Sequence, residues 1–551
     1  MAVSKSNVAV LAHEPIRIGS GGGFWGDRPL APVDLLKSDD LDYMMIDYLA
    51  ELTLSIMTKQ KRRDPSSGWA TDLEIWLAAG GIDALRKKKV KLVTNGGGAN
   101  PESCARMVLE QATKIGWHEC KVAVISGDDI LPRLDYLLKN GEELTHFESG
   151  ETISDNGAEM MSANAYLGAG PIASALEIGA DIIITGRVAD ASLLVGCMLH
   201  SAGWAYNAFQ LGLTRESPVV DWAPKHITNP LDILAQWTIA GHLIECGAQV
   251  CGGNYSNWDE VPNLATLTLP IAEIYLNSDV KITRGRGGGG MVNRKIVAEQ
   301  LIYEIGDPEA YITPDVVVDM RNITIEDESE DVVVVTGAVG KPEPKSLKVS
   351  AAVEGGWFAS SSLLISGPNA LARATACDLA LRARLSALEE LEIYTEFIGG
   401  GVTLPKNIRQ QLQPILNPPE VLLRWAVTSP NRQNITEFTR EVAPLVLTGP
   451  AGVGGYGART KPRRQLQFWP TLISRKSVES LVKIELLTHL HITPESERFH
   501  FIRKRTRGFI SRLQDELDER EWTRPIVKKL GFERNDSIAE LTIPKEKEVE
   551  I

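Results

Sequence analysis

Short apolar runs alternate with amphipathic segments through the first part of the chain. Five of these runs end in glycine or polar residues, and they span residues 16–19, 43–47, 90–95, 121–126 and 181–186. Such runs are typical of buried parallel strands. The segments between them predict helices over residues 70–88, 100–116 and 162–180. Strands that alternate with helices predict an α/β fold with a Rossmann-like parallel sheet covered on both faces.

The pattern changes near residue 263. From there, runs rich in β-branched residues predict antiparallel strands, and residues 368–391 predict one helix. We therefore expect three parts. They are a parallel-sheet domain carrying an active site (1–262), an α+β domain that completes the site (263–475) and a charged, mostly helical extension (476–551).

The residues that follow the five predicted strands are the first candidates for a site. In parallel sheets, ligands bind beyond the carboxyl ends of the strands, where the following loops gather. We expect substrate contacts from Ser20, Gly22, Gly23, Trp25, Arg28, Asn95, Gly97, Asp128 and Arg187. The alternative is that these turns are polar only because loops usually are.

Carboxylates in the same loops offer one kind of catalysis. Asp27, Glu51 and Asp190 each follow a predicted strand. Crowded carboxyl groups raise one another's pKa, which suits general acid–base catalysis, while Arg28 and Arg187 would bind a carboxylate or hold an enolate. Each acid has a structural alternative as a helix cap or an exposed turn residue.

A nucleophile is the competing possibility. Residues 229–250 predict a helix capped near Asn229, on which His242 and Cys246 share a face and Glu245 lies three residues from His242. A Cys–His pair can generate a thiolate for acyl transfer. Both residues are also common as structural core residues.

The stretch IRIGSGGGFWGDRP, residues 16–29, contains the glycine spacing of a dinucleotide fingerprint, with Asp47 where a ribose-binding acid would stand. Phe24 and Trp25 occupy the place where a helix should begin, which argues against NAD(P). We expect no cofactor here. The glycines instead predict a backbone that approaches a ligand, and the two aromatics predict an apolar wall facing Arg187 and Asp190, unless they pack in the core.

A second glycine run, residues 284–290, precedes a helical pattern and contains two arginines. It favours either an anion site, with a CoA or carrier-arm phosphate as the natural ligand, or a flexible loop between a hairpin and a helix.

Composition narrows the class of protein. The net charge of −13 excludes a general affinity for nucleic acid, and no run of 18 apolar residues predicts a membrane span. The N-terminus is a poor signal peptide, so we expect a cytoplasmic protein. The six cysteines form no Cys-x-x-Cys pair and no His-x-x-x-His occurs, so no metal site is expected. A homo-oligomer remains open.

Several unusual blocks resemble one family. GSGGGFWGDR (19–28), VTNGGGANP (93–101), residues 163–193 and GPAGVGGYG (449–457) are similar to the acyclic terpene utilisation, or AtuA-like, family. The resemblance covers residues 16 to 473 and departs at Cys251, where relatives more often carry Thr, and in the tail after residue 476.

The resemblance implies a small-molecule acyl substrate, carried on CoA or on a carrier protein. Fungal relatives, which the chain resembles, accompany polyketide synthases that make α-pyrones and are regarded as hydrolase-like or lactonising enzymes. Bacterial relatives resemble partners of acyl-CoA carboxylases and hydratases in terpenoid acid breakdown. The expected function is thus lactonisation or hydrolysis. An acyl-CoA lyase or hydratase, and a non-catalytic scaffold of a synthase or carboxylase, are the alternatives.

Overall fold

The computed structural model describes residues 14–204, 229–275, 279–412 and 418–491. The chain divides into two compact units, which we call the larger and the smaller unit. The larger unit comprises Met1–Asp128, Tyr166–Leu347 and Arg475–Ile551, and the smaller unit comprises Asp129–Ala165 and Lys348–Ser474.

A ten-stranded mixed sheet forms the centre of the larger unit. Its middle contains the five predicted strands in the order β1 (Ile16–Ser20), β2 (Tyr43–Ile46), β3 (Lys91–Thr94), β6 (Ile182–Thr185) and β4 (Val122–Ser126). Every neighbouring pair among these five is parallel. The predicted parallel α/β sheet is therefore confirmed.

Antiparallel strands extend this sheet at both edges. Beyond β1 lie β7 (Pro270–Ile274), β8 (Val280–Arg284), β12 (Val332–Thr336) and β11 (Thr324–Ser329), and beyond β4 lies β19 (Lys483–Leu487). The strands after residue 263 thus continue the first sheet, because β7 pairs directly with β1. The division in the structure differs from the one predicted at residue 262. The predicted extension begins with α17 (Arg475–Glu479) and β19, and its part beyond residue 491 lies outside the described residues.

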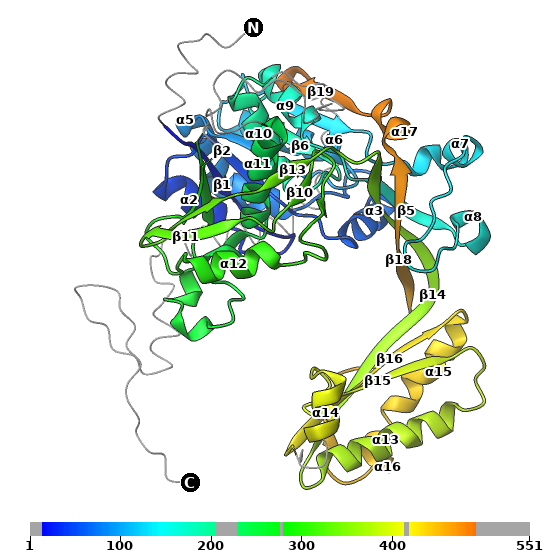
Figure 1. The fold of residues 1–551 in the computed structure, drawn as a ribbon. Helices are drawn as coiled ribbons and strands as arrows, with labels where there is room; N and C mark the ends of the chain where they lie inside the picture. Colours follow the sequence, from blue (N-terminus) through cyan, green and yellow to red (C-terminus); the bar gives the residue numbers. More distant parts are fainter. Residues whose placement is uncertain (1–13, 205–228, 276–278, 413–417, 492–551) are drawn as a thin grey trace. The chain divides into compact units, whose positions relative to one another are not determined.

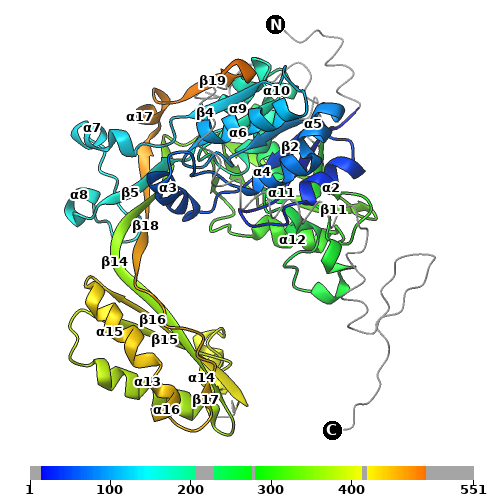
Figure 2. The same cartoon turned by 180° about the vertical axis from the view of Figure 1, so that it is seen from behind.

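Helices cover both faces of the sheet, as the alternating pattern predicts. Figure 1 shows one face covered by α9 (Gly170–Glu177), α10 (Ser192–Ser201) and α11 (Pro230–Glu245). Figure 2 shows the opposite face, covered by α2 (Ala31–Ser38), α4 (Asp72–Trp76), α5 (Ile82–Lys88) and α6 (Pro101–Lys114). The strand residues Met44, Ile46 and Leu92 pack with this second group in one hydrophobic core.

Smaller elements complete the larger unit around α11. The sheet formed by β13 (Val339–Lys341), β10 (Val317–Asp319) and β9 (Tyr311–Ile312) contacts α11, as does α12 (Arg294–Ile302). The helix α3 (Thr53–Arg63) follows β2. Because α11 is enclosed on all sides, every residue from Pro230 to Glu245 except Asp232 is buried.

The segment 162–180, predicted as one helix, is a strand followed by a helix. Residues Met160–Ala165 form β5, which pairs with β14, and α9 starts only at Gly170. Pro171 at the first turn explains the start, because proline lacks the N–H that a preceding helical turn would require. The prediction for residues 162–169 was wrong.

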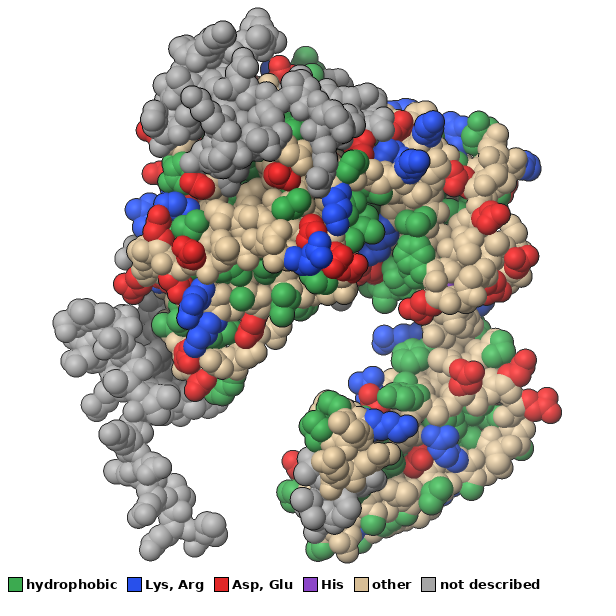
Figure 3. Space-filling model, viewed as in Figure 1, with side chains coloured by type: hydrophobic (Ala, Val, Ile, Leu, Met, Phe, Trp, Pro, Cys, Tyr) green, Lys and Arg blue, Asp and Glu red, His purple; other side chains and the backbone are tan. Residues whose placement is uncertain are grey.

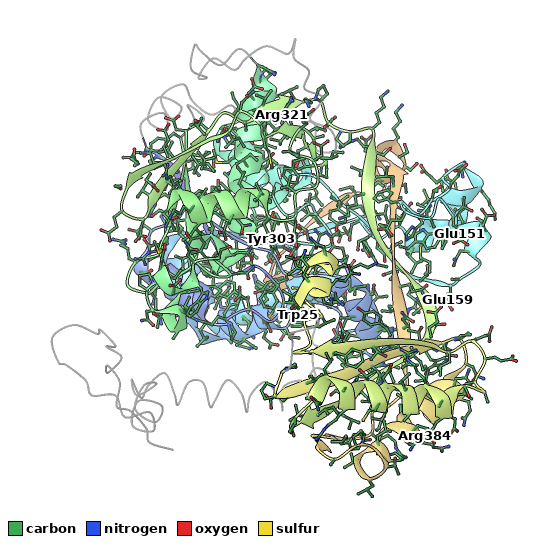
Figure 4. All side chains as sticks on the ribbon, turned by 60° about the horizontal axis from the view of Figure 1, so that its bottom comes forward. Trp25, Glu151, Glu159, Tyr303, Arg321 and Arg384 are labelled. Atoms are coloured by element: carbon green, nitrogen blue, oxygen red, sulfur yellow. The ribbon has the colours of Figure 1, made fainter. Side chains whose placement is uncertain are left out.

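An antiparallel sheet and two main helices form the smaller unit. The strands are β15 (Glu392–Ile398), β16 (Glu420–Ser429), β14 (Ser346–Ser366), β17 (Val453–Gly454), β18 (Arg463–Ser474) and β5. The predicted helix is α13 (Ala370–Leu385), which packs with α15 (Arg432–Val442) over Trp425 of β16. Arg384, labelled in Figure 4, lies on α13 and donates a hydrogen bond to Thr448. The shorter helices are α7 (Leu134–Lys139), α8 (Ile153–Asn156), α14 (Lys406–Leu412) and α16 (Leu445–Thr448).

The surface carries charges of both signs. Figure 3 shows acidic and basic side chains interspersed on the face of the larger unit that is visible there. Among the described helices, none has both the length and the apolar composition that a bilayer span requires.

Candidate active site

A cavity of about 450 Å³ opens in the larger unit where three strand-end loops meet the end of α11. Its lining comes from the segments after β1, β2 and β6, from the turn after α11 and from the end of α12. The lining residues are Gly23, Phe24, Asp27, Asp47, Leu49, Ala50, Glu51, Arg187, Asp190, Glu245, Cys246, Ala248, Gln249, Gly253, Asn254, Tyr303 and Glu304. The prediction that these loops share one edge of the sheet is confirmed, because parallel strands place their following loops together.

Acidic side chains outnumber basic ones in this cavity, which we call the acidic cavity. Six carboxyl side chains line it, against the single guanidinium of Arg187. Four of the acids follow β1, β2 or β6, and the other two, Glu245 and Glu304, come from the ends of helices. Such surroundings disfavour a free carboxylate at the reacting end of a ligand and favour an uncharged group there.

The Arg187 side chain is buried and held by protein groups. It forms an ion pair with Asp190, donates a hydrogen bond to the Leu49 carbonyl oxygen, and places its Cζ atom 4.1 Å from the centre of the Tyr166 ring. Its backbone N–H donates to Asp128 Oδ2 at 2.7 Å. Only its Nε atom makes no hydrogen bond to a described residue. Arg187 therefore organises Asp190 and the loop after β2, which leaves little of its guanidinium for a ligand.

Asp47 is a buried carboxyl that the sequence singled out only as a ribose-binding acid. Asn95 Nδ2 and the Leu49 N–H donate hydrogen bonds to its Oδ1 atom at 2.6 and 2.9 Å. Burial raises the pKa of Asp47 well above its usual value, and the nearby charge of Asp190 adds to the effect. Asn95 is fully buried and accepts from the Tyr48 N–H at 2.8 Å, so it supports Asp47 and does not line the cavity.

Glu245 and His242 form a buried pair at the end of α11. His242 Nδ1 lies 3.2 Å from Glu245 Oε1, and His242 Nε2 lies 3.1 Å from the Leu301 carbonyl oxygen. A carbonyl only accepts, so Nε2 carries a proton, and the contact at Nδ1 requires one further proton shared with Oε1. The predicted contact between Glu245 and His242 is therefore present.

Burial sets the acid strength of this pair. It raises the pKa of the Glu245 carboxyl to about 7, although His242 acts in the opposite direction. Burial also acts to lower the pKa of His242, but the hydrogen bond and charge of Glu245 outweigh it and raise that pKa. Glu245 Oε2 makes no hydrogen bond to any described residue. The cavity thus contains a carboxyl group that titrates near neutral pH, with one oxygen unpartnered.

The predicted Cys–His nucleophile is not assembled in the structure. Both ring nitrogens of His242 are occupied by Glu245 and Leu301, and His242 does not line the cavity. Cys246 does line it, but burial and then the charge of Glu245 raise the pKa of its thiol. The thiolate that acyl transfer needs is therefore disfavoured.

The glycines after β1 allow close packing. A Cβ on Gly21 would lie 2.4 Å from Ile46 Cγ1, and one on Gly23 would lie 2.6 Å from the backbone carbon of Cys246. Gly22 has φ +146°, and Ser20, fully buried, contacts it through Oγ. Of these residues only Gly23 lines the cavity. The stretch packs against β2 and the end of α11, and it does not open a helix, since α2 begins only at Ala31.

The two aromatic residues that follow β1, Phe24 and Trp25, lie in different surroundings. Phe24 is 55% exposed and lines the acidic cavity, whereas Trp25 packs against the hydrophobic core. Asp27 accepts a hydrogen bond from the Gly23 N–H at 3.0 Å and shares the cavity with Arg187 and Asp190. Of the two aromatics predicted to form an apolar wall, only Phe24 shares the cavity with Arg187 and Asp190, and Trp25 packs in the core.

Three more predicted substrate contacts lie outside the cavity. Arg28 points to a different cavity and pairs with Asp34 at 2.7 Å. Gly97 packs closely, because a Cβ there would lie 2.5 Å from the Thr185 carbonyl oxygen. Asp128 is buried beneath Arg187 and Gly186. Their positions indicate structural roles for Gly97 and Asp128.

Tyr303 and Glu304 are cavity residues that the sequence analysis missed. Both follow α12, which lies after the predicted domain boundary, and no periodic pattern singles them out. Glu304 has φ +61°, an uncommon value for a residue other than glycine, and its charge raises the pKa of the Tyr303 hydroxyl. Figure 4 labels Tyr303, together with Trp25 from the segment after β1. Within the described part of the chain, no group of three or more His, Cys, Asp or Glu side chains is arranged to hold a metal ion.

Comparison with known proteins places the chain in a family. The model for "Acyclic terpene utilisation family protein AtuA" matches residues 16–212 and 221–484. The chain belongs to this family. Every residue that lines the acidic cavity lies within the matched ranges of the AtuA family. No curated protein and no solved structure matches the chain.

Proposed function

We propose that the protein is an enzyme that uses the Glu245 carboxyl as a general acid–base group on an acyl thioester, and that it catalyses lactonisation or hydrolysis. One observation carries the proposal: the pKa of Glu245 lies at about 7, in a cavity where its Oε2 atom lacks a partner. A general base works best when its pKa lies near the working pH.

The chemistry follows from this placement. In lactonisation, Glu245 takes the proton from an enol hydroxyl of the substrate, and the enol oxygen forms a bond to the thioester carbon. The carbon–sulfur bond then breaks, and Glu245 returns the proton to the leaving thiolate. In hydrolysis, water takes the place of the enol hydroxyl. His242 acts as a positioning residue, because it holds Oε1 and leaves the buried Oε2 without a hydrogen-bond partner among the described residues.

The charge of the cavity selects the reacting group. The excess of carboxyl groups over cations in the lining disfavours a free carboxylate but not the neutral carbonyl of a thioester. Phe24, Leu49 and Ala248 add apolar lining that suits the hydrocarbon part of an acyl chain.

A second candidate is hydration or dehydration of an unsaturated acyl thioester. The family match to acyclic terpene utilisation favours it, since terpenoid acids carry branched, unsaturated chains. The same carboxyl groups would move the proton, but water would be added to a carbon–carbon double bond and the thioester would remain intact.

The test uses purified protein with polyenyl and β,δ-diketo thioesters. Pyrone formation is followed by ultraviolet absorbance, and released thiol by a colorimetric reagent. We expect Glu245→Gln to lower the rate by about 100-fold or more. Glu119→Gln, an exposed matched control, should keep the rate of the unaltered protein. Loss of double-bond absorbance without thiol release would favour the hydratase. A rate equal to that without enzyme for every substrate would refute catalysis and favour the scaffold alternative.

A further inference from the structure

A second cavity of about 460 Å³ lies in the larger unit, away from the acidic residues described above. It is bounded by α2, by residues 266–269 before β7 and by the glycine-rich turn after β8, residues 285–288. We call it the glycine-loop cavity. The proposed reaction uses none of these residues.

The charge of the glycine-loop cavity is opposite to that of the acidic cavity. Arg28, Lys37 and Arg286 line it, with Asp34 as the only lining acid. Asp34 is already paired with Arg28 at 2.7 Å. Lys37 is exposed and makes no hydrogen bond or ion pair with any described residue. An anion in this cavity would therefore meet an uncompensated positive charge.

The buried carboxylate of Asp39 holds Arg286 in place. Its Nε atom and its backbone N–H donate hydrogen bonds to the two carboxylate oxygens of the buried Asp39, at 3.0 and 2.9 Å. The side chain of Arg286 is nevertheless 68% exposed. A fixed but accessible guanidinium is the usual protein partner of a phosphate group, because its donors match the phosphate oxygens.

The glycines of the turn bring backbone to the cavity wall. Gly287 has φ +81°, and a Cβ built there would meet no atom within 4 Å. A Cβ on Gly288 would lie 2.5 Å from Thr268 Cγ2, and one on Gly285 would lie 2.7 Å from Leu35 Cδ1. Side chains at these positions would clash or alter the turn, so glycine keeps an open, backbone-lined surface. Turns of this kind are well suited to anions.

We propose that the glycine-loop cavity binds the phosphate groups of coenzyme A, so that the acyl substrate reaches the acidic cavity as a CoA thioester. This assignment rests on the proposed function for the choice of carrier. Asp27 lines the acidic cavity and the next residue, Arg28, lines the glycine-loop cavity. The two cavities therefore share one short segment of the chain, which the pantetheine arm of a bound CoA thioester would have to span.

Binding is measured by isothermal titration calorimetry with inorganic phosphate, adenosine 3′,5′-bisphosphate and CoA as separate probes. The full chain is used in low-salt buffer. We expect the bisphosphate and CoA to bind at least tenfold more tightly than inorganic phosphate, and added salt to weaken both. Lys37→Glu should weaken the binding of the bisphosphate by tenfold or more. Lys295→Gln, which changes an exposed lysine outside the cavity, should leave it unchanged.

A second variant guards against an indirect effect. Arg286→Gln removes the exposed guanidinium, and its melting temperature without ligand shows whether the turn has been disturbed. Equal affinity for all three probes, or unchanged affinity in both Lys37→Glu and Arg286→Gln, would overturn the proposal.

The outcome is separable from that of the proposed function. Glu245→Gln should bind CoA as the unaltered protein does. If short thioesters without a nucleotide are converted and CoA does not bind, the reaction stands and the CoA site fails. If CoA binds through Lys37 and Arg286 but no thioester is converted, the CoA site stands and the reaction fails.

Discussion

The buried Glu245 carboxyl makes a quantitative prediction about stability. In the unfolded chain its pKa returns to the ordinary value of 4.5, whereas in the folded protein burial raises it to about 7. The folded state therefore holds this proton more tightly than the unfolded state. Below pH 4.5 both states are protonated. Between pH 4.5 and about 7 the unfolded state releases this proton while the folded state keeps it, so stability is lost progressively, and the loss is complete once the pH has risen through the folded pKa.

The magnitude follows from the two pKa values. One pKa unit corresponds to about 1.4 kcal/mol, so the difference between 4.5 and about 7 sets an upper value of roughly 3 kcal/mol. His242 acts in the same direction, because its pKa is also raised in the folded state and its contribution is lost as the pH rises. Glu245→Gln removes the titrating carboxyl, while its amide N–H can still donate to Nδ1 of neutral His242.

The assay is urea unfolding of both proteins between pH 4.5 and 8.5, followed by tryptophan fluorescence. The quantity of interest is the free energy of unfolding of the unaltered protein minus that of Glu245→Gln, because titrating groups outside the His242–Glu245 pair cancel in this difference. We expect it to fall by up to roughly 3 kcal/mol as the pH rises, with most of the change between pH 5 and 7. Glu119→Gln, an exposed carboxyl, serves as control and should give a constant difference. A constant difference for Glu245→Gln as well would refute the reasoning.

Three further substitutions test other parts of the site. Cys246→Ala should keep thioester turnover within about threefold of the unaltered protein, because burial keeps the thiol protonated. A hundredfold loss in steady-state rate would instead support Cys246 as the nucleophile. Gly23→Ala should lower the free energy of unfolding in urea by about 1–3 kcal/mol, since its Cβ would lie 2.6 Å from the Cys246 backbone. Unchanged stability would mean that the loop can shift to accommodate the methyl group. Asn95→Ala should also cost about 1–3 kcal/mol, because Asp47 loses a donor at 2.6 Å. That loss should grow as the pH rises and Asp47 ionises, and a pH-independent loss would contradict the proposed contact.

The local pattern of apolar and polar residues was sufficient to predict the strands and the helix that position the site. The five parallel strands and the cap of α11 at Asn229, whose Oδ1 accepts from the Leu231 N–H at 3.1 Å, follow from apolar runs and capping chemistry. Parallel pairing then dictates that the loops after β1, β2 and β6 meet at one edge. Asp27, Glu51, Arg187 and Asp190 were therefore correctly placed near one another.

The local pattern did not predict the structure of residues whose packing or hydrogen-bonding partners are distant in sequence. Residues 162–165 extend because β14, nearly 200 residues away, supplies their hydrogen-bonding partner. Trp25 and Gly97 carry the same signals as cavity residues but pack against the protein, since the sequence does not state which way a loop side chain points.

The sequence by itself determined the parallel sheet, the family and the acidic character of its loops. Only the tertiary structure decided the chemistry of the site. His242 and Cys246 are four residues apart on one helix, yet the Leu301 carbonyl, 59 positions from His242, takes the second ring nitrogen and turns the imidazole toward Glu245. Burial then moves the pKa of Glu245 to about 7. Proton affinity depends on the atoms packed around a group, and in this cavity those atoms come from segments that only folding brings together.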